Sequence, residues 1–445
     1  MKHRLPDPKP GAGGGCKRIR AMLQVLSSAW ALLLGMGMLM IGNGLQGTIL
    51  GVRGDLEGFS TLQMSFVMSA YFVGFLGGSR MAPEMIRRVG HVRVFAALAS
   101  LISAVMILYP AITNPFAWMA GRVLIGFCFS GVYVTAESWL NNAADNANRG
   151  KALSLYMLVQ MLGIVSAQAL MLLGNPSGYE TFVIASVVIS VSFAPILLSI
   201  SPTPAFDTTK PMTLRQLMDA SPLGCVGMFL LGGVFSAQFG MSAVYAASAG
   251  LTLPQISLFV ATFYVGALVL QYPLGWISDR MDRRVVILFA AAFSGAAAVL
   301  GMAMGANFWM LLLAAFFIGG MTNPLYSLLI AHTNDYLDYD DMAAASGGLV
   351  FINGLGAITG PLITGWLMGE SVFGPPGFFL IMAVLTFALA AYALYRTTQR
   401  ASIAAEDSGT FAPMAPTGSP VAVEFAQEYV IETEMEEQEA AHEAG

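Results

Sequence analysis

Charged residues are scarce in this chain. Aspartate, glutamate, lysine and arginine make up only 11% of its 445 residues, whereas hydrophobic residues make up 56% and the mean hydropathy is +0.68. In an average soluble domain about a quarter of the residues are charged. The composition therefore excludes an ordinary soluble domain and predicts an integral membrane protein in contact with the lipid bilayer.

Cysteine is scarce as well. The three cysteines, Cys16, Cys128 and Cys225, are far apart and form no CxxC pair. This pattern indicates neither a disulfide framework nor a zinc site, and we interpret them as small apolar packing residues. No nucleophile–base pair and no cluster of metal ligands is visible. We therefore expect no enzyme activity, no cofactor, no metal site and no catalytic residue.

Nucleotide-binding motifs are absent too. A glycine run at positions 11–15 precedes Lys17, but Cys16 stands where a phosphate loop requires its second glycine. We interpret residues 1–21 as a basic leader close to anionic lipid. The net charge of −5 comes from ten acidic residues after Arg400; without them it becomes +5. The overall charge thus predicts no nucleic-acid partner.

Twelve apolar runs are long enough to cross a membrane, which takes about 20 residues each. They predict an all-α membrane protein of twelve helices in two pseudo-symmetric six-helix bundles, residues 22–200 and 222–396, joined by a cytoplasmic linker, residues 201–221. The acidic tail, residues 397–445, is expected to be disordered apart from a short helix near 432–441. The runs are residues 22–49, 62–82, 92–112, 116–140, 151–174, 180–200, 222–248, 254–277, 285–305, 308–332, 343–368 and 376–396.

The two bundles carry an internal repeat. Residues 63–90 align without a gap on residues 255–282, a shift of 192 positions that places Tyr-Phe-Val-Gly on Phe-Tyr-Val-Gly. With the N-terminus inside, nineteen of the twenty-one lysines and arginines fall in cytoplasmic segments. This bias predicts a multi-pass protein of the cytoplasmic (inner) membrane with both termini cytoplasmic. We expect a monomer.

Arg122 is the most costly residue in any span, because it lies about six residues inside the fourth. It should face the bundle interior, in a substrate-binding or coupling role or as a tether to backbone carbonyls. Gln46 and Gln238 occur at one depth in the two repeats, which favours a shared cavity over a simple interhelical hydrogen bond. The candidate binding or coupling residues are Arg122, Asn43, Gln46, Gln160, Gln238, Tyr245, Tyr264, Gln271, Asn323, Tyr326 and Asn353.

The segment G-W-I-S-D-R-M-D-R-R, residues 275–284, is too charged to enter hydrocarbon and must be a short aqueous loop. Its acid, Asp279, is expected to face the start of the eleventh helix. The first repeat has Arg87 at that position, so Glu84 or Glu137 is expected to supply the negative charge to Arg87 or Arg88. The candidate gating residues are Gly275, Asp279, Arg280, Arg283, Arg284, Glu84, Arg87, Arg88, Glu137 and Arg149.

Aspartates cluster after the tenth run, at positions 335, 338, 340 and 341. They resemble a calcium loop only superficially, because its central glycine and terminal glutamate are missing. We interpret the segment as a solvated inner loop.

These features together resemble the major facilitator superfamily over residues 22–396. Residues 275–284 are similar to its signature G-x-x-x-D-R-x-x-R-R. The motifs E-S-W-L (137–140), N-R-G-K (148–151) and A-H-T-N-D (331–335) resemble an uncharacterised bacterial branch, the YcaD type. The resemblance implies two bundles that rock about a central site, and Arg122 is similar to a fourth-helix arginine often implicated in proton coupling.

The expected function is a secondary active transporter that moves a small polar or anionic organic solute by alternating access, with protons as the coupling ion. Uniport or exchange stays open, because no central carboxylate is evident in the spans. Multidrug efflux is the first alternative, since 28 methionines and 28 phenylalanines can form an adaptable surface. A membrane sensor that signals through the acidic tail is the second.

Overall fold

The computed structural model describes residues 13–143, 149–198, 212–399, 409 and 411–443. In these ranges it contains twelve helices or composite helices long and apolar enough to cross a membrane, which confirms the predicted fold class. The first six are α1 (Gly13–Leu56), α2 (Thr61–Val89), α3 (His91–Ala111), α4 (Pro115–Ala143), α5 (Arg149–Leu170) with η2 (Met171–Leu173), and α6 (Glu180–Ser192) with α7 (Ala194–Leu198). The second six are α9 (Pro222–Ser236) with η3 (Ala237–Met241) and α10 (Ser242–Ser248), α11 (Leu253–Ser278), α12 (Arg283–Met304), α13 (Phe308–Asn334), α14 (Tyr339–Leu367) and α15 (Gly377–Gln399).

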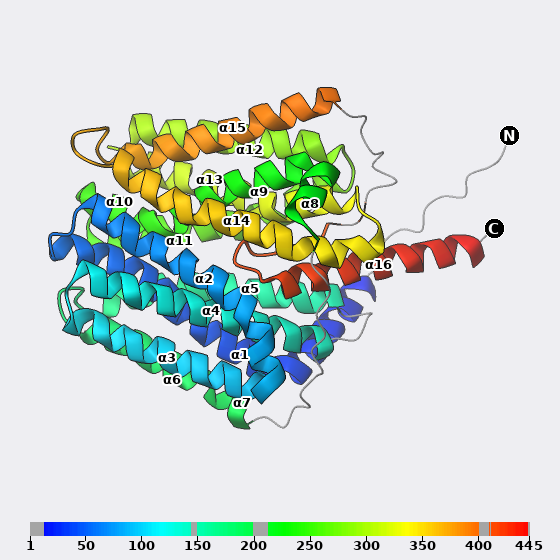
Figure 1. Ribbon diagram of the computed structural model, residues 1–445, viewed down its shortest axis with the longest axis horizontal. Coiled ribbons are helices and arrows are strands. Elements are labelled where there is room, and N and C mark those ends of the chain that lie inside the picture. The colour runs from blue at the N-terminus through cyan, green and yellow to red at the C-terminus, as the bar shows by residue number, and fades with distance from the viewer. Residues whose placement is uncertain (1–12, 144–148, 199–211, 400–408, 410, 444–445) are drawn as a thin grey trace.

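The helices pair in the same way in both halves. In the first half α2 packs on α4 and α1 on α5; the equivalent pairs in the second half are α11 with α13 and α9 with α14. Figure 1 shows the first half, from blue to green, beside the second half, from green to orange. We call the end where α1 begins and α15 ends the terminal end, and the opposite end the far end.

Glycines explain why the repeat is preserved at one crossing. A Cβ on Gly74 would overlap the carbonyl of Val123, and a Cβ on Gly266 would overlap that of Phe316 in the other half. Only glycine lets the two backbones approach this closely. The glycine of the repeated Tyr-Phe-Val-Gly motif therefore sets the α2–α4 crossing and its α11–α13 counterpart.

The two halves are joined directly near the far end. The Thr61 hydroxyl on α2 donates to the carbonyl of Gly365 on α14 at 3.2 Å, and a Cβ on Gly365 would overlap Ser65. Further along the same pair of helices, the Ser69 hydroxyl donates to the carbonyl of Ile358 at 2.6 Å. The interface between α2 and α14 is thus tightly packed where the bundle is farthest from the tail.

The linker contains a helix that was not expected, and the tail contains a longer helix than the short one expected near 432–441. Within residues 201–221, helix α8 (Leu214–Ala220) begins with a capping box at Thr213. The tail differs from the expected disorder, because Pro420–Glu443 form helix α16. Val423 and Phe425 are completely buried. Figure 1 shows α16, in red, entering between the two halves at the terminal end.

Candidate functional site

Arg122 lies in the middle of the bundle, as expected. Its side chain is completely buried, and its guanidinium carbon is 4.8 Å from the centre of the Tyr71 ring. One terminal nitrogen donates to the sulfur of Met68 at 3.5 Å. The other two guanidinium nitrogens have no hydrogen-bond partner among the described residues. The cation is held by an aromatic face and a thioether, which leaves donors for another group.

Neutral polar side chains of the same half are buried as well. The amides of Asn43 and Gln46 are completely buried and, within the described part of the chain, have no partner at hydrogen-bond geometry. The hydroxyls of Tyr71 and Tyr109 lack one too. Unpaired polar groups cost several kcal/mol in a hydrocarbon environment. The first half therefore contains a buried polar cluster that is suited to a polar ligand or to water.

The second half supplies a matching group of side chains. Gln238 lies in the π-helix η3, where its carbonyl accepts from Thr322 at 3.2 Å while its amide nitrogen has no partner in the described ranges. The Asn323 carbonyl and the Tyr326 hydroxyl are also buried without one. π-Helical turns often occur at functional sites. Gln46 and Gln238, which are equivalent in the repeat, thus both have a side-chain amide nitrogen without a partner in the described ranges, whereas only the Gln238 carbonyl is paired.

The other candidates from the sequence are buried too, and three of them contact residues on another helix. Asn353 donates to the carbonyl of Met228 at 3.1 Å, which ties α14 to α9. Gln271 donates to the sulfur of Met157 at 3.1 Å and so links the halves. The Tyr245 ring stacks on Phe378 at 4.8 Å. Gln160 and Tyr264 are buried.

Sequence reasoning missed the aromatic residues that face Arg122. Tyr71 and Tyr109 stand within apolar runs, where an aromatic residue is usually a packing residue. The only available signal for Tyr71 was its place in the repeated Tyr-Phe-Val-Gly motif.

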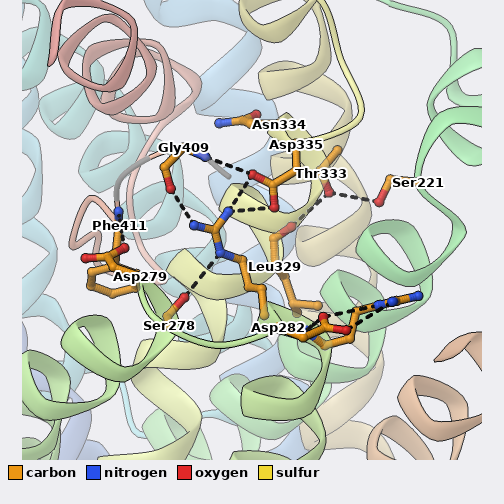
Figure 2. Close-up of polar contacts among 12 residues, drawn as sticks. Ser221, Ser278, Asp279, Asp282, Leu329, Thr333, Asn334, Asp335, Gly409 and Phe411 are labelled. Carbon is orange, nitrogen blue, oxygen red and sulfur yellow. Dashed lines mark hydrogen bonds and ion pairs between the residues drawn. The ribbon is translucent and has the colours of Figure 1, made fainter. Parts of the chain in front are cut away.

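At the terminal end, Arg283 donates hydrogen bonds to Asp335, Gly409 and Ser278, the three partners that Figure 2 labels. One terminal nitrogen of its guanidinium contacts both carboxylate oxygens of Asp335, at 2.6 and 2.7 Å, and the other donates to the carbonyl of Gly409 at 2.5 Å. Its Nε donates to the Ser278 hydroxyl at 3.2 Å. The side chain of Asp335 is only 5% exposed, which differs from the expected solvated loop. The arginine compensates the buried carboxylate.

Asp279 contacts the tail instead of the start of α14, its expected partner. Its carboxylate accepts the backbone N–H of Phe411 at 2.8 Å, and burial raises its pKa. Gly275, one turn earlier, leaves room for the Phe411 ring, because a Cβ there would lie 2.5 Å from a ring carbon. Three signature residues, Gly275, Asp279 and Arg283, therefore bind the tail.

The other two arginines of the signature contact residues of the signature itself. Arg284 pairs with Asp282, the residue that caps the start of α12, at 3.0 Å. The guanidinium of Arg280 lies over the exposed Trp276 ring at 4.2 Å. These two arginines act on their own loop.

In the first half, Glu84 and Glu137 were the two acids expected to pair with Arg87 or Arg88, and their contacts differ. Glu84 contacts Arg87 at 2.5 Å and Arg88 at 2.6 Å, all on the surface, so the Glu84 pairing is the one present in the structure. Glu137 pairs with neither arginine. Its buried carboxylate accepts from the Tyr156 hydroxyl at 3.3 Å and from the backbone N–H of Ser419 at 3.0 Å.

Arg149 also contacts the tail. It forms an ion pair with Glu428 and donates to Asn141 at 3.0 Å. Glu137 and Arg149, predicted as gating residues, thus contact the same segment as the signature loop of the second half.

The sequence model of the Major Facilitator Superfamily matches residues 32–222 and, a second time, residues 223–426. The chain belongs to this superfamily. The boundary between the matches coincides with the start of the second bundle. Family and fold make the chain a membrane transport protein rather than an enzyme.

Curated relatives are named as uncharacterized MFS-type transporters. YcaD of Escherichia fergusonii is 27% identical over 321 residues, which cover 70% of this chain and 81% of the relative. A transporter of Yersinia pestis is 24% identical over 312 residues, with 69% and 80% covered. These relatives support the YcaD-type branch that the three motifs predicted.

Solved transporters share the fold. The nucleoside transporter NupG superposes with a TM-score of 0.62 at 14% identity, over 82% of this chain and 98% of that chain. A bacterial homolog of the human lysosomal transporter Spinster, inward-facing and unoccupied, gives 0.62 at 15% identity, over 96% and 99%. The Escherichia coli fucose:proton symporter FucP gives 0.54 at 15% identity, over 82% and 98%. At such identities the likeness concerns the fold alone.

Proposed function

We propose that this transporter moves a small polar or anionic organic solute, which binds at Arg122 and the surrounding amides and phenols. The observation that supports this is the buried guanidinium with two nitrogens left without partners in the described chain. A cation-selective site would place a carboxylate at this depth. Here the groups nearest to the cation are an aromatic ring and a thioether.

The lining also favours a solute with an apolar part. Tyr71, Phe72, Phe75 and Phe235 line one small cavity from both halves. Their rings supply contact area without charge, and a carboxylate or phosphate on the same molecule would meet Arg122. The same rings favour multidrug efflux as the second candidate, in which an apolar compound would not need the arginine.

Proton coupling is the finer part of the proposal. Glu137 is a completely desolvated carboxylate in α4, and its contacts are hydroxyl and N–H groups rather than a base. A carboxylate in this setting gains and loses a proton as its surroundings change between the two states of the transporter. Fucose:proton symport by FucP shows that the fold supports such coupling in that protein. The bias of lysine and arginine supports cytoplasmic termini in the inner membrane.

A binding screen tests the solute class. Purified protein is heated with organic acids, neutral polar metabolites or lipophilic cations, and the shift in Tm is recorded for wild type, Arg122→Ala and the surface control Arg280→Ala. We expect acids to raise Tm in the wild type and the control but not in Arg122→Ala. Stabilisation by lipophilic cations that survives Arg122→Ala would instead establish the efflux alternative.

Coupling is tested with the solute that the screen identifies. Vesicles that contain the protein are given an inward proton gradient, an outward one or none. Accumulation that follows the gradient, and is lost in Glu137→Gln, supports proton coupling. Equilibration at one rate under all three conditions would show uniport.

A further inference from the structure

We propose that the tail is a built-in plug: Gly409 and residues 411–430 occupy the cavity between the two halves and hold the transporter in a blocked state until they withdraw. The proposal rests on the proposed function in one respect, namely that solute passes through this cavity. We call these residues the tail plug.

The tail plug is bound to the second half by specific polar contacts. The backbone N–H of Met414 donates to the Ser327 hydroxyl at 2.8 Å on α13. The amide of Gln427 donates to Asn334 at 2.9 Å and accepts from Ser346 at 3.0 Å. All three partner side chains, Ser327, Asn334 and Ser346, are buried. Together with the contacts of Asp279 and Arg283, they form a continuous docking surface on one half.

The same segment is bound to the first half. Ser419 donates to Glu137 through both its N–H and its hydroxyl. Six residues further on, Phe425 lies under the Arg149 guanidinium at 5.9 Å, and Glu428 pairs with that arginine. Gly150 leaves room for the Tyr429 ring, since a Cβ would lie 2.5 Å from it. The tail plug therefore bridges the halves at the end where they would have to move apart or close.

The tip of the tail plug reaches the candidate binding site. Residues 416–418 line a cavity with Tyr71, Phe75 and Asn353, and only about 20 Å³ is left there. That space holds about one water molecule. Tyr71 is also the residue whose ring contacts the Arg122 guanidinium. A solute at Arg122 would therefore have the tail plug directly on its terminal side.

This arrangement blocks two steps of transport at once. The halves are already joined at the far end through α2 and α14. Closure of the terminal end needs the volume that the tail plug fills, and exchange of solute with that side needs the same path. A state in which neither can occur is an inhibited state, and withdrawal of the tail plug restores both.

The test measures access to the cavity and needs no solute. Val350→Cys places one thiol on the wall beside the tip, in a chain whose three native cysteines are alanine. Asp55→Cys, exposed near the far end, is the matched control. Both proteins are treated with a water-soluble maleimide as full-length chains and as chains that end at Arg400. Truncation is expected to speed labelling of Val350→Cys roughly tenfold or more, because the rate follows the open fraction, and to leave Asp55→Cys unchanged.

A second pair of variants covers the case in which truncation harms folding. Gln427→Ala in the full-length chain removes the contacts to Asn334 and Ser346 and is expected to speed labelling in the same direction. Conversely, Ser346→Cys and Gln427→Cys are combined in one chain and joined by a short reducible bifunctional thiol reagent. The readout is then the protection of Glu424 from a glutamate-specific protease. Cross-linking should abolish cleavage at Glu424, and reduction should restore it.

Equal labelling of Val350→Cys in the full-length, truncated and Gln427→Ala proteins would overturn the plug. The solute screen can fail without changing this result, and the plug can fail while Arg122 still binds acids. If both hold, the truncated chain should bind the identified acid more tightly than the full-length chain, since the tail no longer competes.

Discussion

Glu137 of helix α4 and Ser419 of the tail are 282 positions apart, and the carboxylate of the first accepts the backbone N–H of the second at 3.0 Å. This contact joins a residue of the E-S-W-L motif to a segment that composition alone describes as an acidic tail. The motif residue is thus part of a docking site as well as of a helix.

Glu137→Ala should release the tail. It removes the acceptor of both Ser419 donors, and hydrogen bonds to a charged acceptor contribute about 1.5–3 kcal/mol, or roughly tenfold or more in the docked population. The tail has ten acidic residues but no lysine or arginine after Arg400, so a glutamate-specific protease is the appropriate probe. Faster cleavage at Glu424 and Glu428, read by mass spectrometry, is the expected result. Glu84→Ala, which changes a surface pair, should leave cleavage unchanged.

Gly275→Ala should displace the Phe411 ring without unfolding the bundle. The added Cβ would lie 2.5 Å from that ring. Gly347→Ala is a matched control, because a Cβ at that helical glycine meets nothing within 4 Å. We expect faster cleavage of the tail in the first variant only, with both Tm values near that of the wild type. A fall in Tm for Gly275→Ala alone would mean that this glycine serves the α11 packing instead.

The spans, the repeat and the buried arginine could be predicted from the sequence because each depends on a local rule. A run of apolar residues crosses the bilayer, and a lone arginine inside such a run must face the interior. The tail could not be predicted in this way. Its few apolar residues, such as Val423 and Phe425, are too sparse to form a core and become buried only against a cavity built by both halves. Asp335 was misjudged for a similar reason, since its partner Arg283 lies at the start of α12, 52 positions earlier.

Gly126→Ala and Gly319→Ala should destabilise the two halves to a similar extent. A Cβ at Gly126 would overlap the carbonyl of Tyr71, and one at Gly319 would overlap that of Phe263. Overpacking at such a site costs about 1–3 kcal/mol. Thermal unfolding in detergent measures the loss, with Gly77→Ala as the control, where the nearest atom is 3.8 Å away. Unchanged Tm values in the two test variants would contradict the backbone crossing.

Arg283→Ala should cost far more stability than Arg87→Ala. The first leaves the carboxylate of Asp335 buried without its cation, a loss of about 3–5 kcal/mol. The second breaks a pair on the surface, where water screens the attraction, so we expect little loss of stability. If Asp335→Asn restores much of the Tm lost in Arg283→Ala, the cost arises from the unpaired charge. No recovery would assign it to packing of the arginine side chain.

Rising pH should release the tail through Glu424. In the docked tail, burial raises the pKa of this carboxyl from near 4.5 to about 7. The docked state therefore holds the proton more strongly, so docking is strongest below pH 4.5 and weakens as pH rises to about 7, by at most about tenfold per pH unit. The labelling rate of Val350→Cys is divided by that of Asp55→Cys at each pH, because the reactivity of both thiols increases with pH. This ratio should increase over the window. With Glu424→Gln the ratio should stay flat and low. A slope that persists in this variant would point to Asp279 or Glu137, the other two carboxylates that accept hydrogen bonds from the tail.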